Sequence, residues 1–254
     1  MGIFNVKDKV VLVTGGSRGI GKAIALAFGE AGARVVVGAR KVELLQQVAE
    51  EIRGHGSDAL VVECDLSKDP DLLKLVSNTV DEFGRLDILV NNAAISPYVK
   101  KSEELDKDEW EEVIRINLTA PFLLCREAAK IMIKNNWGRI INVASVGGLV
   151  GLPRQLAYSV CKGGLIQLTR SLAIEWSPRY NITVNAIAPG YIITDLTEGM
   201  RASEVISGEL LKRTPVRRFG ESNEIVTAAL YFASEYSSYT TGAVLTVDGG
   251  WMAS

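Results

Sequence analysis

The sequence is poor in the residue types that metal centres and disulfide frameworks require. Among its 254 residues there is one histidine, His55. The three cysteines, Cys64, Cys125 and Cys161, are widely spaced. An odd number of scattered cysteines predicts reduced, partly buried thiols, and a single histidine cannot supply a zinc site of ordinary composition. We therefore expect no bound metal and a cytoplasmic location.

Neither an excess of one charge nor a long apolar run is present. The chain has 28 basic and 30 acidic residues, which gives a net charge of −2 and no sign of a nucleic-acid surface. The longest charge-free apolar stretch near the centre, 140–153, has 14 residues, whereas a spanning helix needs about 20. Lys7, Asp8 and Lys9 precede the first apolar run, unlike a secretory signal. We expect neither a membrane nor a nucleic-acid partner.

What the chain does have is seven short β-branched runs separated by longer segments of helical period. The runs lie at 10–13, 34–37, 59–63, 86–90, 140–143, 182–187 and 244–247, and helical patterns follow the first three at 22–31, 42–53 and 71–83. Strands alternating with helices predict an α/β fold with a doubly wound, seven-stranded parallel sheet covered by helices on both faces. With no internal repeat or linker, we expect a single domain over residues 1–254.

A glycine-rich loop stands between the first strand and the first helix. It carries Gly15, Gly19 and Gly21 in the sequence VVLVTGGSRGIGKAIALAF. Backbone N–H groups at such a helix start can hold a pyrophosphate. The spacing departs from G-x-G-x-x-G, since counting from Gly19 puts Ile24 at the third glycine. Tight packing of the turn is the alternative, but its place after the first strand favours phosphate binding.

The second strand ends without the acidic residue that would bind a ribose 2′-hydroxyl. Residues 31–42 contain no Asp or Glu, and Arg40 and Lys41 lie there instead, with Arg18 in the first loop. A guanidinium binds a 2′-phosphate in bidentate fashion, whereas an acid would repel it. The pattern predicts NADP(H) as the preferred cofactor, with NAD(H) still possible. The alternative for Arg40 is a solvated surface charge.

Two further polar positions follow strands and so belong to the ligand-binding edge of a parallel sheet. Asp65 follows the third strand and Asn91 follows the fourth. Either could contact a cofactor, although a helix N-cap for Asp65 and a turn for Asn91 would also explain them.

Tyr158 and Lys162 are four residues apart in a helical pattern, so their side chains project from one face. A free phenol has a pKa of about 10, and a nearby ammonium would lower it and make Tyr158 a usable acid/base. Ser145, after the fifth strand, could donate a hydrogen bond to an oxygen on which charge develops. An ordinary exposed helix pair is the alternative.

Residues 106–134 form a long helical pattern interrupted by Pro121. Because proline has no N–H, the carbonyl of Asn117 loses its helical partner and could hold a water that links Lys162 to solvent. A purely structural kink is the alternative.

Together these motifs resemble the short-chain dehydrogenase/reductase family over essentially the whole chain. The resemblance implies a Rossmann fold and a catalytic tetrad of Asn117, Ser145, Tyr158 and Lys162. It implies that Tyr158 is the acid/base and that Ser145 binds the substrate oxygen. Lys162 would lower the pKa of the Tyr158 phenol and bind the nicotinamide ribose. The implied cofactor contacts are Gly15, Ser17, Arg18, Gly19, Ile20, Gly21, Arg40, Asp65, Leu66, Asn91, Ala93, Tyr158, Lys162, Pro189, Gly190, Ile192 and Thr194.

The resemblance also bears on substrate and assembly. Residues 191–213 resemble a substrate lid. The C-terminal tail ends apolar, and such tails in this family pack across a tetramer interface, which implies a homotetramer. The alternative is only a last strand and a frayed end. Relatives include gluconate 5-dehydrogenases and carbonyl reductases, so we expect a small carbonyl, sugar-acid or polyol substrate. A 3-oxoacyl-carrier-protein reductase is the alternative, although Ile174 stands where those enzymes often carry an arginine.

Two other readings use the same residues differently. The segment Gly15–Gly19 matches the G-x-S-x-G elbow of hydrolases around Ser17. His55, however, precedes the third strand and so belongs to the opposite edge of the sheet. A non-catalytic dinucleotide sensor would keep the fold and make Tyr158 dispensable.

Overall fold

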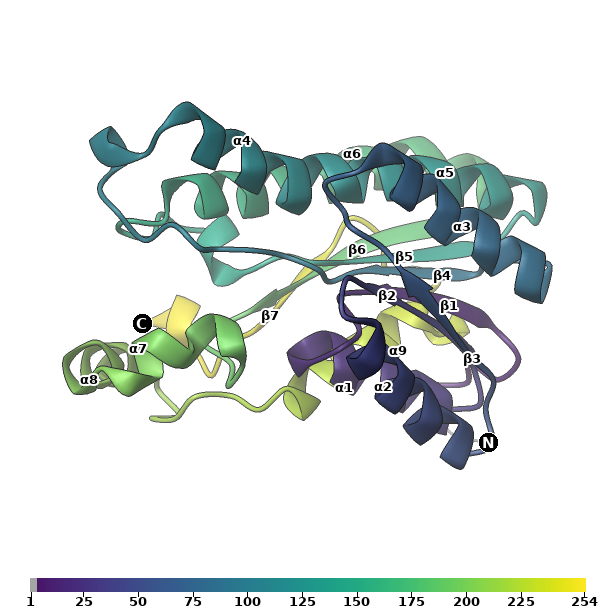
Figure 1. Ribbon diagram of the computed structural model, residues 1–254, viewed down its shortest axis with the longest axis horizontal. Coiled ribbons are helices and arrows are strands. Elements are labelled where there is room, and N and C mark those ends of the chain that lie inside the picture. Colours follow the sequence, from purple (N-terminus) through teal and green to yellow (C-terminus); the bar gives the residue numbers. More distant parts are fainter. Residues whose placement is uncertain (1–3) are drawn as a thin grey trace.

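The computed structural model describes residues 4–254 and contains one seven-stranded sheet (Figure 1). All neighbouring strands are parallel and their order is β3-β2-β1-β4-β5-β6-β7. This confirms the predicted doubly wound α/β fold. The strands are β1 (Val10–Thr14), β2 (Arg34–Ala39), β3 (Ala59–Glu63), β4 (Ile88–Asn91), β5 (Gly138–Val143), β6 (Ile182–Pro189) and β7 (Val244–Val247).

Helices cover both faces of the sheet, as Figure 1 shows. One layer holds α1 (Gly19–Glu30), α2 (Val42–Gly54) and α9 (Asn223–Ala233), and the other holds α3 (Asp69–Phe83), α4 (Lys107–Ile114), α5 (Ala120–Lys134) and α6 (Leu156–Tyr180). Every residue of the central strands β1, β4, β5 and β6 is buried, as parallel strands covered on both faces should be. The edge strand β7 is less covered, and Leu245 is 40% exposed.

The long helix expected over residues 106–134 is divided into two. Between α4 and α5 the residues Arg115–Thr119 form a wide π-type turn. The distortion therefore lies one turn before Pro121, where the missing N–H of the proline releases a carbonyl from the regular ladder. The side chain of Asn117 is buried in this turn.

The chain reverses its winding direction between β1 and β4, which are neighbours in the sheet. The loops after these two strands diverge toward opposite sides, and ligands of open α/β sheets bind in the resulting crevice. Two short helices, α7 (Glu198–Ala202) and α8 (Glu204–Arg213), lie beyond this end of the sheet together with the C-terminus (Figure 1). No helix of residues 4–254 combines the length and the apolar character needed to span a membrane.

Candidate active site

A cleft of about 620 Å³ lies at the carboxyl ends of the strands. Loops after β1 to β6 and the segment after residue 190 all contribute to its walls. Most of the predicted site residues line it together: Gly15, Ser17, Arg18, Gly19, Ile20, Gly21, Arg40, Asp65, Leu66, Ala93, Ser145, Tyr158, Lys162, Pro189, Gly190, Ile192 and Thr194. The side chains of Asn91 and Asn117 are buried outside these walls.

The glycine loop has the shape of a phosphate cradle. Gly15 has a φ of +65°, and a Cβ at Gly21 would lie 2.2 Å from the Gly15 carbonyl oxygen, so a side chain at position 21 would break the turn. The helix α1 that follows has no side-chain cap on its first N–H groups. These groups and the positive end of the helix dipole face the cleft, and they fit the pyrophosphate of a dinucleotide.

Asn92 holds this cradle in place and was missed as a site residue by the sequence reasoning. Its Nδ2 donates to the carbonyl oxygens of Thr14 (2.9 Å) and Gly15 (3.2 Å), and the Thr14 hydroxyl accepts from its backbone N–H at 3.0 Å. Successive side chains of a strand point to opposite faces of the sheet, so the side chains of the adjacent Asn91 and Asn92 have different partners. Asn91 points inward, where its Nδ2 donates to Asn142 Oδ1 at 2.9 Å.

The part of the cleft next to β2 and β3 is rich in charge. Arg40 and Lys41 line this part of the cleft. Asp65 faces them, and its pKa is held below the ordinary value chiefly by hydrogen bonds from Ser67. Arg18 instead forms an ion pair with Asp195, which comes from the segment after β6.

Tyr158 and Lys162 lie on one face of α6, as predicted from their spacing. The Lys162 Nζ is 5.6 Å from the centre of the Tyr158 ring and donates to the Val143 carbonyl oxygen at 2.7 Å. Ser145 is the N-cap of a short turn, and its Oγ accepts from the Gly147 N–H at 3.0 Å. The three side chains therefore converge where β5 and α6 meet the cleft.

The pKa values of the pair are set mainly by burial. Lys162 is 3% exposed, and burial lowers the pKa of its amine from 10.5 to about 8. Burial also raises the pKa of the Tyr158 phenol, and a hydrogen bond with Ser145 opposes this rise. The pKa of Tyr158 is therefore raised, whereas the sequence predicted that Lys162 would lower it. Burial disfavours the charged phenolate, and the Lys162 amine donates to Val143.

Asn117 fixes the floor of the cleft through its side chain. Its Oδ1 accepts from the Ile95 N–H at 2.8 Å, and its Nδ2 donates to the Ile95 carbonyl at 2.7 Å. Ile95 itself lines the cleft. The wide turn before Pro121 thus ties the loop after β4 to the helix layer.

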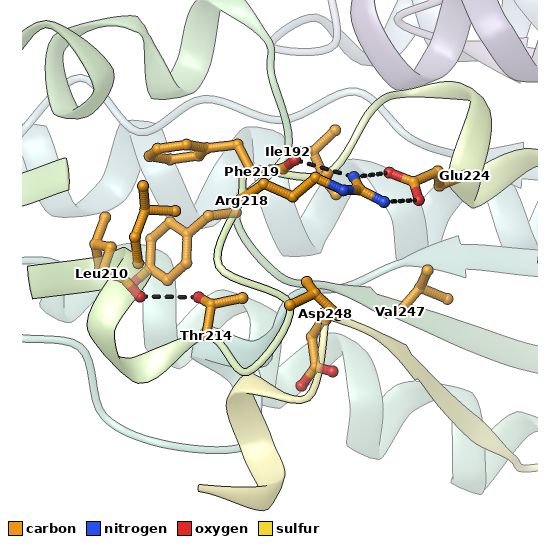
Figure 2. Close-up of a pocket in the computed structure, with 13 residues that line it drawn as sticks. Ile192, Leu210, Thr214, Arg218, Phe219, Glu224, Val247 and Asp248 are labelled. Atoms are coloured by element: carbon orange, nitrogen blue, oxygen red, sulfur yellow. Dashed lines mark hydrogen bonds and ion pairs between the residues drawn. The ribbon is translucent and has the colours of Figure 1, made fainter. Parts of the chain in front are cut away.

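The segment after β6 closes the cleft from the remaining side. Thr194 begins a short turn beside the glycine loop, and a Cβ at Gly19 would lie 3.1 Å from the Thr194 methyl carbon. Ile192 also lines a second cavity of about 100 Å³ at the base of α8. Figure 2 shows Arg218 and Glu224 paired on one side of this cavity, and Thr214 bonded to the Leu210 carbonyl on the other.

His55, Cys125 and Cys161 lie outside the walls of the cleft, whereas Cys64 lines it beside Asp65. His55 follows α2 and its Nε2 is 3.6 Å from a Glu30 carboxylate oxygen, at the amino end of β3. Ser17 is at the carboxyl end of β1, so the two cannot form a hydrolytic pair. The three cysteines are free and buried.

Comparisons with known proteins agree with this geometry. A family model described as enoyl-(acyl carrier protein) reductase matches residues 15–252. A 3-oxoacyl-[acyl-carrier-protein] reductase from Aquifex aeolicus is 42% identical over 246 residues, which cover 96% of this chain and 98% of that protein. An uncharacterized oxidoreductase from Thermotoga maritima is 41% identical over 97% of this chain and 98% of its own length.

A solved structure has the same fold over nearly the whole length. It is a gluconate 5-dehydrogenase from Burkholderia cenocepacia J2315 in complex with NADP and tartrate, 33% identical, with a TM-score of 0.94 over 99% of this chain and 98% of that one. The chain belongs to the short-chain dehydrogenase/reductase family and is an NAD(P)-dependent oxidoreductase acting on CH–OH groups.

Proposed function

We propose that the protein interconverts a ketone or aldehyde and an alcohol with NADP(H) as its preferred cofactor. The observation that carries this proposal is the convergence of Ser145, Tyr158 and Lys162 on a cleft whose other end is a glycine cradle. Arg40 and Lys41 support the choice of NADP(H), because they would neutralise a 2′-phosphate. The relative that binds NADP supports it too. NAD(H) remains the second cofactor.

When bound, NADPH supplies the hydride that adds to the carbonyl carbon. In the reductive direction the Tyr158 hydroxyl donates its proton to the carbonyl oxygen and Ser145 donates a hydrogen bond to the same oxygen. The raised pKa of Tyr158 keeps the phenol protonated and ready to act as the acid. The protonated Lys162 stabilises the phenolate that this transfer leaves.

The other site residues would hold the reactants. The backbone around Gly15, Gly19 and Gly21 holds the pyrophosphate, and Lys162 holds the nicotinamide ribose. Asn117 positions Ile95 through two hydrogen bonds and would hold a relay water through its main chain. Residues 191–213 act as the substrate lid.

A 3-oxoacyl-[acyl-carrier-protein] reductase is the second candidate function. It is favoured by the relative of 42% identity that has this activity by name. Ile174, on α6, is 78% exposed where a cation would be expected to contact an acidic carrier. For this reason we place small carbonyl substrates first. We further propose a cytoplasmic homotetramer, which the exposed edge strand β7 supports.

The decisive experiment replaces Tyr158 with Phe. Without the phenolic proton, kcat/KM with NADPH and a ketone should fall by about three orders of magnitude. The affinity for NADPH, measured by fluorescence titration, should stay close to that of the wild type. Tyr180→Phe, in the last turn of the same helix, is the matched control and should change neither quantity. Full turnover by Tyr158→Phe would mean that another group supplies the proton. A wild type that binds NADPH but turns over no carbonyl compound would instead indicate a non-catalytic dinucleotide-binding sensor.

A further inference from the structure

The charges that line the cleft are unevenly divided between its two ends. The basic side chains Arg18, Arg40 and Lys41 come from the loops after β1 and β2. The rest of the cleft, from the loop after β4 to the lid, is called the substrate section here. Its walls are mainly apolar or neutral: Ile95, Pro97, Val99, Ile116, Leu152, Gln155, Tyr191 and Met200. Within the described chain, the charged residues lining this section are Glu112, Lys162 and Asp195.

Two of these three charges already have partners. Lys162 is buried and donates to the Val143 carbonyl, and Asp195 is paired with Arg18. A basic side chain of the lid, Arg201, donates to the Thr194 carbonyl at 3.3 Å and does not line the cleft. The substrate section therefore contains no free cation, among residues 4–254, to receive a substrate carboxylate.

Glu112 remains at the rim as a carboxylate that has no ion-pair partner among residues 4–254, since the neighbouring Lys100 pairs with Glu109. It lies on the exposed side of α4, and its Oε2 accepts from the Tyr98 hydroxyl at 2.5 Å. This hydrogen bond raises the pKa of Tyr98 to about 12, so the phenol stays protonated and donates to the carboxylate. Tyr98 thus holds the charge of Glu112 beside the substrate section.

We propose that the substrate section selects uncharged carbonyl compounds and rejects carboxylates, and that Glu112 is a specificity-determining residue for this choice. The inference rests on the proposed function and narrows its substrate class. Keto-sugar acids are then poor substrates, and neutral ketones, esters or thioesters are good ones. The physical reason is repulsion between the substrate carboxylate and the Glu112 carboxylate, with no free cation lining the substrate section to offset it.

The test compares a keto ester with its own acid. We would measure kcat/KM with NADPH at low ionic strength for methyl 4-oxopentanoate and 4-oxopentanoate, and for the corresponding 3-oxobutanoate pair. In the wild type the ester should be preferred by about tenfold or more. Glu112→Gln should reduce this ester-to-acid ratio by about fivefold, mainly by improving turnover of the acid. Added salt should also reduce the wild-type ratio, because it screens an exposed charge.

Glu111→Gln is the matched control. Glu111 is the preceding residue of α4, is exposed, lies outside the cleft walls and pairs with Lys107 at 3.4 Å. Its replacement changes the net charge equally and should leave the ratio unchanged. Should Glu112→Gln fold poorly, Tyr98→Phe serves instead, because it frees the carboxylate to turn into solvent and should also reduce the ratio.

The outcomes separate the two proposals. An acid reduced as well as its ester by the wild type would overturn the selection of neutral substrates. An unchanged ratio in Glu112→Gln, or an equal change in Glu111→Gln, would overturn the role of Glu112. Absence of turnover for the whole panel, with NADPH still bound, would instead overturn the proposed reduction of small carbonyl compounds with NADPH, and the inference with it.

Discussion

The floor of the cleft and its lid differ in how firmly they are held. Ser145, Lys162 and Asn117 are 8%, 3% and 1% exposed, and each side chain bonds to the backbone of another segment or of its own turn. The lid helices α7 and α8 contain no buried residue. The comparison teaches that the proposed proton-transfer groups are preorganised by the core. The proposed substrate lid has little buried surface in α7 and α8 and can therefore adjust.

The lid is nevertheless anchored at one end. The Arg213 guanidinium at the end of α8 lies 3.7 Å from the centre of the Trp251 ring, and the Ser254 hydroxyl donates to the Arg213 carbonyl at 2.8 Å. Trp251 is 2% exposed. These contacts fix the end of α8 to the C-terminal residues of the chain.

The largest effect should come from a change in the floor. Lys162→Met should lower kcat/KM by about two to three orders of magnitude, because the phenolate loses its ammonium. The same change should raise the melting temperature at pH 7. Lowering the pKa of this amine from 10.5 to about 8 corresponds to about 3 kcal/mol of burial cost. Loss of the bond to Val143 offsets about 1 kcal/mol of the gain.

The pH dependence of this stability gain has a definite sign. Below pH 8 the amine is charged in both the folded and unfolded states, so the burial cost is fully present. Between pH 8 and about 10.5 the unfolded state binds the extra proton, so the wild type gains stability with rising pH and its difference from Lys162→Met shrinks. Thermal unfolding of both proteins from pH 6 to 10 measures this, with Lys134→Met, exposed at the end of α5, as the control. A Lys162→Met variant less stable than the wild type at pH 7 would contradict the account.

An intermediate effect is expected at the cofactor end of the cleft. Arg40→Asp should shift the ratio of kcat/KM for NADPH over NADH by about two orders of magnitude toward NADH, because a cation for the 2′-phosphate is replaced by an acid. Steady-state kinetics with both cofactors measure the ratio. Lys134→Asp makes the same charge change at the opposite end of the sheet and should leave it unaltered. An unaltered ratio in Arg40→Asp would show that Arg40 is a solvated charge.

The sequence was most informative where the core dictates the structure. The apolar runs gave all seven strands, and the run at 59–63 coincides with β3. Periodicity also placed Tyr158 and Lys162 on one helix face, because a regular helix of buried residues has a fixed geometry. The edge strand β7 proved less covered than its apolar sequence suggested, since one of its sides has no neighbour in the sheet.

Properties that depend on several segments at once could not be read in this way. The pKa of Tyr158 is raised because several surrounding elements bury the phenol. The spacing of Tyr158 and Lys162 on one helix predicted a lowered pKa, because it carries no information about burial. The inward turn of Asn91 and the support that Asn92 gives to the cradle depend on strand parity at the sheet edge. Glu112 belongs to no sequence motif, so its place in the wall of the cleft could not be predicted from the sequence and is a consequence of the fold.

The smallest effect should come from the ion pair between Arg18 in the glycine loop and Asp195 in the segment after β6. Arg18 and Asp195 are 177 positions apart and pair across the mouth of the cleft, but each side chain is 60% exposed. Exposed ion pairs contribute about 0–1 kcal/mol, so Asp195→Asn should lower the free energy of unfolding by less than about 1 kcal/mol. Because Arg18 also lines the cofactor cleft, the variant should bind NADPH slightly more tightly, with a gain that disappears at high salt. Denaturant unfolding and NADPH titration at two salt concentrations measure both, with Glu198→Gln in α7 as the control. A loss of several kcal/mol would mean that the lid is as firmly built as the floor, and substrate choice would then depend on a rigid wall rather than on an adjustable one.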